Sequence, residues 1–419
     1  MSEWREVTLG DLCDRVTVGH VGKMVDEYVS DGVPFLRSQN VKPFSIAREG
    51  MLYIGDEFNR KLAKSTLRTG DVVVIRTGYP GTAAVVPAEL DGANCADLVI
   101  ITPSEDLNPH MLAAVFNSAW GRSAVGGQLV GSAQQHFNVG SAKALRVRLP
   151  GRKHQDRIAG VLCALNDLIE NNRRRVELLE EMAKAIYREW FVHFRYLDHE
   201  DNTFVDSPLG LIPERWETTD IATTAATVTR GIAPKYADDG DWTVLNQKCI
   251  RNQRVSFDKA RRQERKVPPA KQVCFGDVLI NSTGVGTLGR AALYFGDHPR
   301  LTVDSHVTIV RPADPSLNPW FGLALNALQS DFEALGTGST GQTELRRDDV
   351  GALPIAVPSS EVRARFADLV WPLLNGIDPL LMQARHLETL RDLLLPKLVT
   401  GRIDVLSLDL DAAVEASAA

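Results

Sequence analysis

The chain has 419 residues, of which 44% are hydrophobic and 24% charged, and its formal net charge is -6. This length and apolar content predict a globular protein of two or three domains. The net acidity argues mildly against nucleic-acid binding, because such domains are often basic overall. Five cysteines without a CxxC pair argue against a disulfide framework or a thiolate metal site.

The chain contains no apolar stretch of 18 residues, and no basic start followed by an apolar run. We therefore expect neither a membrane span nor a signal peptide, and we expect the protein to be cytoplasmic.

Residues 1–150 alternate short apolar runs of β type with turn signals. The runs at 33–36, 71–76 and 98–102 are bounded by Gly, Pro and Asp rather than repeated at helical spacing. This pattern predicts an α+β domain and not a parallel sheet.

From Gln155 the pattern changes to apolar residues at intervals of three, four and seven, running from Ile158 to Trp190. It predicts one amphipathic helix of about 40 residues within the segment 151–197. Such a helix would be ~60 Å long and could cover at most ~18 base pairs of B-DNA. It is long enough to set a distance along a duplex.

The second half repeats this order. A globular stretch, 198–357, precedes a second helical stretch, 358–403, and we expect the tail 404–419 to be disordered. Pro372, Gly376 and Pro379 predict a kink or break near 371–379.

Matching residues confirm that the two halves are similar. The offset between partners varies from 206 to 212 in the globular parts and is 208 at both helical positions. The pairs are Trp4 with Trp216, Leu36 with Leu245, 70–73 with 276–279, 77–78 with 283–284, 108–109 with 318–319, Pro150 with Pro358, and Leu179 with Leu387. One period of about 208 residues predicts two domain-plus-helix units in a pseudo-two-fold relation. Two similar units suit a ligand with two similar ends.

Both halves carry a basic stretch in the same place. Residues 248–271 hold nine basic and two acidic side chains, and residues 42–68 hold six basic and three acidic ones. One such stretch could be an ordinary solvated surface, but its recurrence favours contact with phosphates.

Residue type and repeat position suggest which side chains contact DNA. Arg suits guanine, Asn and Gln suit adenine, and Lys mostly contacts phosphate. A Gly-Ser turn precedes glutamine in both halves, at Gln135 and Gln342, although an ordinary surface turn would look the same. The candidates for base contact are Arg37, Gln39, Asn40, Arg76, Gln134, Gln135, Asn246, Gln247, Arg251, Arg254, Gln342 and Arg346. The candidates for phosphate contact are Lys42, Arg60, Lys61, Lys64, Lys248, Arg261, Arg262, Arg265 and Lys266.

No catalytic constellation is evident. Residues 318–321 (NPWF) lack the second proline of an amine-methyltransferase loop, and residues 336–341 lack the lysine of a phosphate-binding loop. The nine histidines show no HxxxH or HxH spacing, so we expect no metal. We predict no catalytic residue and no cofactor bound by this chain.

Four stretches resemble a known family. Residues 179–194 (LEEMAKAIYREWFVHF) and 210–216 (GLIPERW) are similar to the central region of the specificity subunit of type I restriction-modification enzymes. Residues 390–403 resemble that family's C-terminal signature, and Gly70-Asp71 and Gly276-Asp277 its strand entry. The resemblance covers essentially the whole chain.

The resemblance implies an α+β fold with two target-recognition domains, separated by two long antiparallel helices. Each domain would read one half of a bipartite double-stranded DNA target. The helices would also dock two methyltransferase subunits, and restriction subunits would join the complex. Those partners would use S-adenosylmethionine, ATP and Mg, whereas this subunit would do no chemistry itself.

Three aromatic residues lie near the end of the first helix: Tyr187, Trp190 and Phe191. This is a higher aromatic content than a solvent-exposed helix end favours. We therefore predict that they dock a partner. The alternative function is a freestanding bipartite DNA-binding regulator or scaffold, which would need no such docking face.

Overall fold

The structure is a computed structural model that describes residues 4–127, 136–336 and 343–405. The chain divides into two compact units. The first comprises residues 1–172 with 383–419, and the second comprises residues 173–382. The expected tail 404–419 falls almost wholly outside the described residues.

The first unit is built around an antiparallel sheet in the order β2-β11-β8-β9. Its strands are β2 (Cys13–Val18), β11 (Leu98–Pro103), β8 (Val72–Ile75) and β9 (Ala83–Val85). Alternate residues of β8 enter two different apolar clusters, Val72 and Val74 on one face and Val73 and Ile75 on the other. The sheet is therefore covered on both faces, which explains its continuous apolar strands.

A second sheet of the first unit, in the order β10-β4-β7-β3, contains one parallel pair, β10 with β4. Its strands are β10 (Asn94–Cys95), β4 (Val33–Leu36), β7 (Leu52–Ile54) and β3 (Tyr28–Val29). Two further pairs join β1 (Arg5–Thr8) to β12 (Arg146–Leu149) and β5 (Val41–Lys42) to β6 (Ser45–Ile46). The short helices are α1 (Asp56–Lys61), α2 (Pro109–Asn117), α3 (Ala119–Gly126) and α4 (Val139–Ala144).

The second unit repeats this plan. Its main sheet is β16-β24-β21-β22, and its second sheet, β20-β17-β23, again has one parallel pair, β17 with β23. The main strands are β16 (Ala225–Arg230), β24 (Val307–Pro312), β21 (Val278–Asn281) and β22 (Ala291–Leu293). The others are β20 (Arg261–Gln263), β17 (Trp242–Leu245), β23 (Leu301–Val303), and the pairs β15 (Glu217–Asp220) with β25 (Pro354–Val357) and β18 (Ile250–Arg251) with β19 (Arg254–Val255). One hairpin, β13 (Phe204–Ser207) with β14 (Gly210–Pro213), has no counterpart in the described part of the first unit. Short helices α6 (Ile221–Thr224), α7 (Trp320–Ala327), α8 (Gln329–Ala334) and α9 (Arg347–Gly351) complete the domain.

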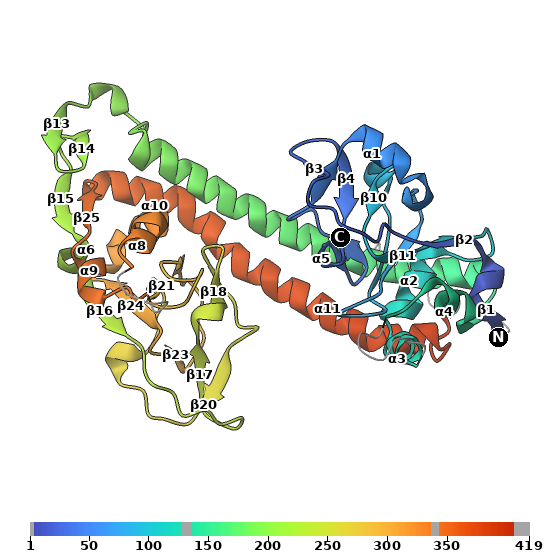
Figure 1. The fold of residues 1–419 in the computed structure, drawn as a ribbon. Coiled ribbons are helices and arrows are strands. Elements are labelled where there is room, and N and C mark those ends of the chain that lie inside the picture. The colour runs from blue at the N-terminus through green and yellow to red at the C-terminus, as the bar shows by residue number, and fades with distance from the viewer. Residues whose placement is uncertain (1–3, 128–135, 337–342, 406–419) are drawn as a thin grey trace. The chain divides into compact units, whose positions relative to one another are not determined.

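The long helix predicted for the first half is present. Helix α5 (Arg152–Tyr187) has 36 residues and continues into a π-helical turn, Arg188–Val192. It appears in green in Figure 1 as one uninterrupted helix. The second helical stretch is broken as predicted, into α10 (Ser360–Asn375) and α11 (Ile377–Val399). Pro379 lacks the N–H that would bond the carbonyl of residue 375, so the first helix ends there.

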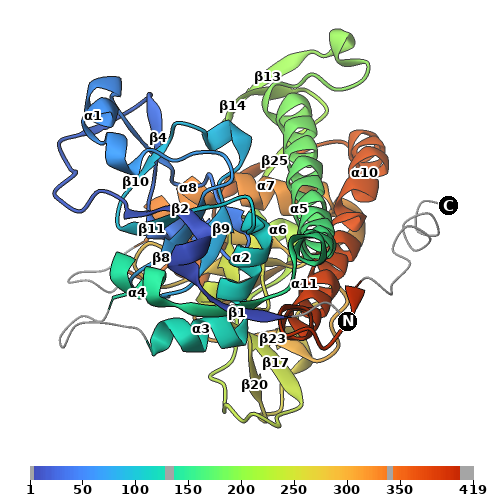
Figure 2. The same ribbon diagram turned by 90° about the vertical axis from the view of Figure 1, so that its right-hand side faces the viewer.

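In each unit α5 packs antiparallel to the other helical stretch. In the first unit Ile158 and Leu162 share a cluster with Leu395 and Leu398, and Arg391 donates a 3.0 Å bond to Asn166. In the second unit the rings of Tyr187 and Phe366 lie 6.4 Å apart. Figure 2 shows α5 foreshortened, with its turns stacked down the picture. The structure confirms the predicted α+β fold with two similar domains and an antiparallel helix pair.

Candidate nucleic-acid interface

Each unit contains one buried aspartate in its Gly-Asp step, and the polar contacts of the main sheet centre on it. The side chains of Asp71 and Asp277 are fully buried, and the preceding glycines, Gly70 and Gly276, both have φ of 86°. Each carboxylate accepts a bond from a backbone N–H three residues earlier, 2.9 Å from Arg68 and 2.8 Å from Cys274. A residue with a Cβ is strained at such a φ, which explains the glycine at this step.

An arginine neutralises each aspartate, but the two arginines come from opposite strands. Arg15 lies on β2 and bonds Asp71 at 2.5 Å, whereas Arg311 lies on β24 and bonds both oxygens of Asp277 at 2.7 Å. In the sheet register Arg15 faces Thr102, and Arg311 faces Thr227. Arginine and threonine have therefore exchanged places across the strand pair.

The exchange preserves the contacts of the arginine. Arg15 donates to the carbonyl of Thr66, at 3.1 Å, and Arg311 to that of Gln272, at 2.6 Å. Those two acceptors are repeat partners, with the same offset as the Gly-Asp steps. Both units thus keep an arginine–aspartate ion pair at the same place in the fold, although the arginine comes from a different strand in each.

Several residues predicted to contact bases instead hold the domain together. Asn40 is fully buried, and its amide donates to the carbonyls of Ala47 and Glu49, so the prediction that it contacts DNA is wrong. Its side-chain oxygen also accepts from the N–H of Arg37. A buried asparagine amide needs acceptors, and these two carbonyls supply them.

The repeat position of Arg37 is Asn246, and both side chains are engaged. Arg37 donates 2.7 Å to the carbonyl of Gly50. Asn246 donates 2.7 Å to the carbonyl of Lys259 and accepts from the N–H of Lys248. Both begin a short 3-10 turn that leads into the hairpin β5-β6 or β18-β19. Their polar groups order this turn, and since both side chains are partly exposed, their contact with bases stays a prediction.

Arg76 and Arg254 are committed to carboxylates. Arg76 pairs with Asp97 at 2.6 Å and also donates to the carbonyl of Phe137. Arg254, on β19, pairs with Glu180 on α5, so it ties the hairpin to the long helix. The side chains of Arg76 and Arg254 are 13% and 34% exposed, and that of Asp97 is 39% exposed, so contact of these two arginines with bases stays a prediction.

Gln247 lies beside the turn that joins β21 to β22. Its side-chain oxygen accepts a 3.3 Å bond from the Thr283 hydroxyl, which also lies 2.8 Å from Nδ1 of His306. The equivalent threonine, Thr77, donates 3.4 Å to Asp97. Gln247 is partly exposed, so it remains a candidate for base contact at this turn.

The remaining candidates are exposed, and their contact with DNA stays a prediction. In the first unit these are Gln39, Lys42, Arg60, Lys61 and Lys64, of which Lys61 forms an exposed pair with Glu57. In the second unit they are Lys248, Arg251, Arg261, Arg262, Arg265, Lys266 and Arg346. Arg261 covers the ring of Tyr236 at 3.6 Å, which leaves its edge free to donate hydrogen bonds. Gln134, Gln135 and Gln342 lie outside the described residues.

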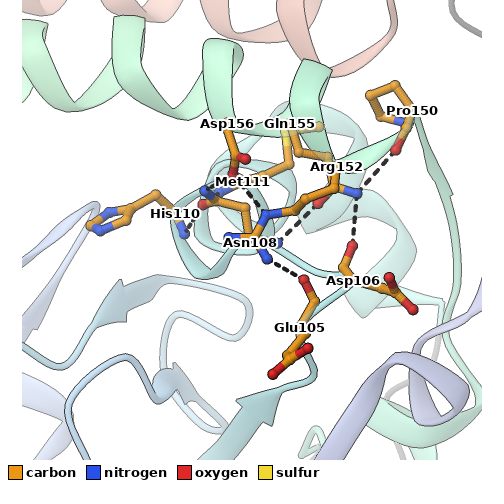
Figure 3. Close-up of polar contacts among 9 residues, drawn as sticks. All are labelled: Glu105, Asp106, Asn108, His110, Met111, Pro150, Arg152, Gln155 and Asp156. Carbon is orange, nitrogen blue, oxygen red and sulfur yellow. Dashed lines mark hydrogen bonds and ion pairs between the residues drawn. The ribbon is translucent and has the colours of Figure 1, made fainter.

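The junction of the first domain with α5 is a dense polar network (Figure 3). Gln155 on α5 donates to the carbonyls of Asp106 and Pro150, at 3.1 and 3.0 Å, and accepts from the N–H of Asn108 at 2.9 Å. Asn108 also caps α2 and donates 2.7 Å to Asp156, whose pKa is lowered by hydrogen bonds from Arg152 and then from Asn108. The helix is thereby fixed to the domain at its first turn.

The second unit has the equivalent bond at its own helix entry. Arg363 on α10 donates 3.0 Å to the carbonyl of Pro358, as Gln155 does to that of Pro150. Both pairs of partners are 208 residues apart. The first turn of each helical stretch is therefore tied by a matching bond to the proline that precedes it.

The aromatic residues predicted to dock a partner are inside the second unit. Trp190 and Phe191 are 7% and 8% exposed, and the Phe191 ring lies 4.7 Å from Phe366 and 5.7 Å from Trp216. Burial raises the pKa of the Tyr187 hydroxyl. The prediction that Trp190 and Phe191 face a partner is wrong, because residues far away in sequence cover them, whereas for the partly buried Tyr187 it stays a prediction.

Other apolar side chains of the long helices are exposed. Met182 on α5 and Leu390 on α11 are repeat partners, 51% and 45% exposed. Leu178 stands one turn before Met182, and Leu393 almost one turn after Leu390, at 49% and 61% exposure. We call these two pairs the helix stripes. The sequence pattern placed Met182 and Leu390 in the apolar seams of their helices, and only the structure shows that they face outward.

No protein-family model matches the chain. Over 288 residues it is 21% identical to the MjaIX specificity subunit, from a type I restriction enzyme of Methanocaldococcus jannaschii. That match covers 66% of this chain and just under two thirds, 64%, of the archaeal protein. The chain is also 21% identical to the HindI type I specificity subunit of Haemophilus influenzae, over 96% of this chain and 100% of that protein.

The fold gives the same answer. The crystal structure of a type I restriction-modification S subunit from M. genitalium matches with a TM-score of 0.62 at 14% identity. The match covers 95% of this chain and 96% of that one. The chain thus resembles type I specificity subunits in sequence and has the fold of one.

Within residues 4–127, 136–336 and 343–405, no three His, Cys, Asp or Glu side chains are placed to hold a metal ion. Each helix in those ranges is too short or too polar to cross a membrane. That this chain binds no metal or cofactor of its own stays a prediction.

Proposed function

We propose that this chain is the DNA-specificity subunit of a type I restriction-modification complex in the cytoplasm. Each recognition domain reads one half of a bipartite double-stranded target, and the helices set the spacing. The observation that carries the proposal is the duplication of a whole domain with its helix joint, in a chain that has the fold of an S subunit. Two equivalent readers suit a target with two separate halves.

In this proposal the chain contributes no catalytic group. The buried carboxylates Asp71 and Asp277 each pair with an arginine, so neither is available as a general base. S-adenosylmethionine, used to methylate adenine, and ATP with Mg, used by the restriction subunits, would be bound by the partners. This chain would bring the target to them.

We also assign the helix stripes to partner docking. Half-exposed Leu and Met residues one turn apart on a helix offer an apolar face to another helix. Met182 and Leu390 occupy repeat-equivalent positions and are both large and apolar, as two copies of one partner would require, whereas Leu178 and Leu393 correspond to His386 and Ala185. They therefore support binding of two methyltransferase subunits, and they argue against the freestanding regulator, which would have no use for them.

Co-expression with the methyltransferase subunit from the same operon tests both parts. We expect a complex of one specificity chain with two methyltransferase subunits by mass photometry. Single-molecule sequencing of the host genome should show a split methylated motif with a fixed gap, lost when this gene is deleted. A chain that never co-purifies with that subunit, or an unchanged set of methylated motifs after deletion, would contradict the proposal.

A negative charge introduced into one helix stripe should prevent the binding of one methyltransferase subunit and leave the other bound. We expect Met182→Glu and Leu390→Glu each to give a one-to-one complex, and the double variant to give none, because a buried unpaired carboxylate is costly in an interface. Trp120→Glu and Leu211→Glu are matched controls, 44% and 60% exposed and outside the stripes. Equal losses in the controls would show that the stripes are not the docking faces.

A further inference from the structure

The turns that join β8 to β9 and β21 to β22 carry the two most exposed large apolar side chains of the described residues. Tyr79 is 82% exposed and Val285 is 87% exposed. Each directly follows a Thr-Gly pair, Thr77-Gly78 or Thr283-Gly284, and the offset is 206 throughout. We call Tyr79 and Val285 the turn tips. One exposed apolar residue is ordinary on a protein surface, but the same position exposed in both repeats indicates a use.

The frame beneath each tip is the same. Both glycines have a positive φ, 82° and 107°, which turns the chain sharply and lifts the next residue away from the sheet. Both threonine hydroxyls are held, Thr77 by Asp97 and Thr283 by His306 and Gln247. The tips are thus mounted on a fixed base rather than on an open loop.

The turns differ above that frame. The bond from the N–H of Ile75 to Thr82 encloses six residues, 76–81, and the bond from Asn281 to Arg290 encloses eight, 282–289. The tip is an aromatic residue with a hydroxyl in one repeat and a small aliphatic residue in the other. Met182 and Leu390 of the helix stripes, by contrast, are large apolar residues in both repeats.

This contrast distinguishes the two kinds of ligand. Two copies of one protein partner require matching surfaces, whereas two different half-sites of DNA require different ones. The turn tips differ between the repeats, while the Thr-Gly pair that precedes them is the same. This combination fits contact with DNA better than contact with two copies of one protein partner. Phe137 and Leu345 bond the chain to Arg76 and Ser282 at the base of the same turns, so further elements of each domain meet there.

We propose that the turn tips contact base edges, Tyr79 in one half-site and Val285 in the other. Val285 offers only methyl groups, so it recognises the C5-methyl of a thymine in the major groove. Tyr79 adds a hydroxyl that can donate to or accept from a base edge. The inference rests on the proposed function, and it names residues that determine specificity within it.

Duplexes with uracil in place of thymine give a direct test, because uracil lacks only the C5-methyl. The assay uses the full complex with its methyltransferase subunits and the split motif found by methylation mapping. At one thymine of one half-site we expect uracil to weaken binding of the native complex roughly fivefold, within the range for a lost base contact. Val285→Ala should bind both duplexes equally.

The tyrosine is tested at the other half-site. We expect Tyr79→Ala to reduce discrimination at one base pair there by roughly tenfold, with the Val285 half-site unaffected. Tyr79→Phe keeps the ring and removes only the hydroxyl. Discrimination at that base pair should therefore fall in Tyr79→Phe only if the hydroxyl forms a hydrogen bond with the base. Trp120→Ala and Leu211→Ala, which remove exposed apolar side chains elsewhere, should change neither half-site.

The outcomes separate this inference from the proposed function. If the native complex methylates a split motif and Val285→Ala and Tyr79→Ala leave every base preference unchanged, the turn tips do not read bases. If the native complex shows no split motif at all, the proposed function itself fails. Because both side chains are more than four-fifths exposed, neither substitution should disturb folding, and amide exchange of β8 and β21 checks that.

Discussion

Replacing Arg15 by threonine removes the cation from the buried carboxylate of Asp71. Two bonds to that carboxylate remain, from the N–H of Arg68 and the hydroxyl of Thr102. Removing one partner of a buried ion pair costs about 3 kcal/mol, because the other charge stays buried. We therefore expect Arg15→Thr to weaken the sheet of the first unit by about that amount.

The second unit shows how to restore the pair. There the arginine stands on the strand that in the first unit carries Thr102, and a threonine stands opposite. The double variant Arg15→Thr with Thr102→Arg therefore copies the arrangement of Arg311 and Thr227. We expect it to recover all but about 1 kcal/mol, so that Thr102→Arg restores about 2 kcal/mol when it is added to Arg15→Thr.

Hydrogen–deuterium exchange with mass spectrometry measures this locally, which matters because a chain of two units does not unfold in one step. A loss of 3 kcal/mol should speed exchange of β8 and β11 amides by roughly 100-fold. Strands β21 and β24 of the second unit are the internal control and should not change. The reasoning is refuted if Arg15→Thr exchanges at the native rate, or if the double variant exchanges as fast as the single one.

Three further substitutions follow from the structure. Gln155→Ala should cost about 2 kcal/mol at the joint of α5, because three hydrogen bonds are lost. The loss should be measured as faster amide exchange at residues 105–112. Gln155→Glu should have an intermediate effect, because glutamate keeps only the hydrogen-bond acceptor. Trp190→Ala should cost about 3–5 kcal/mol of second-unit stability through a cavity, seen as faster exchange confined to that unit; a folded chain that merely loses its partners would contradict this. The lowered pKa of Asp156 contributes stability above pH ~3.8 that is lost as the pH falls through the folded-state value. Asp156→Asn should remove that dependence at 105–112, by well under 1 kcal/mol because the pair is half exposed.

The fold was predictable from the sequence because its signals are local. The apolar runs at 33–36, 71–76 and 98–102 became β4, β8 and β11, and the helical spacing after Gln155 became α5. Pro379 and Gly376 placed the break between α10 and α11 correctly, since a missing N–H acts on the turn that contains it. The repeat supplied the architecture.

The site was less predictable, because the type of a side chain limits which groups it can bind but does not identify the group that it contacts in the fold. Asn40 can pair with adenine, but the nearest groups in need of a donor are carbonyls of its own domain. Arg254 can pair with guanine, but in the structure its guanidinium forms an ion pair with Glu180 on α5. Trp190 and Phe191 suggested docking because their partners, Trp216 and Phe366, are distant in sequence. No short-range pattern reveals such contacts.

The duplication itself supplies a better criterion than residue type. Positions that keep their chemistry in both repeats serve what the repeats have in common: the buried aspartate, the helix joint to a proline carbonyl, and the pair Met182 and Leu390. Where the chemistry is kept but its source changes, as for Arg15 and Arg311, the function of the pair is structural. Positions that share a frame and differ in chemistry, as Tyr79 and Val285 do, serve what must differ between the halves. In a protein that reads two unlike half-sites, that difference is the sequence preference itself.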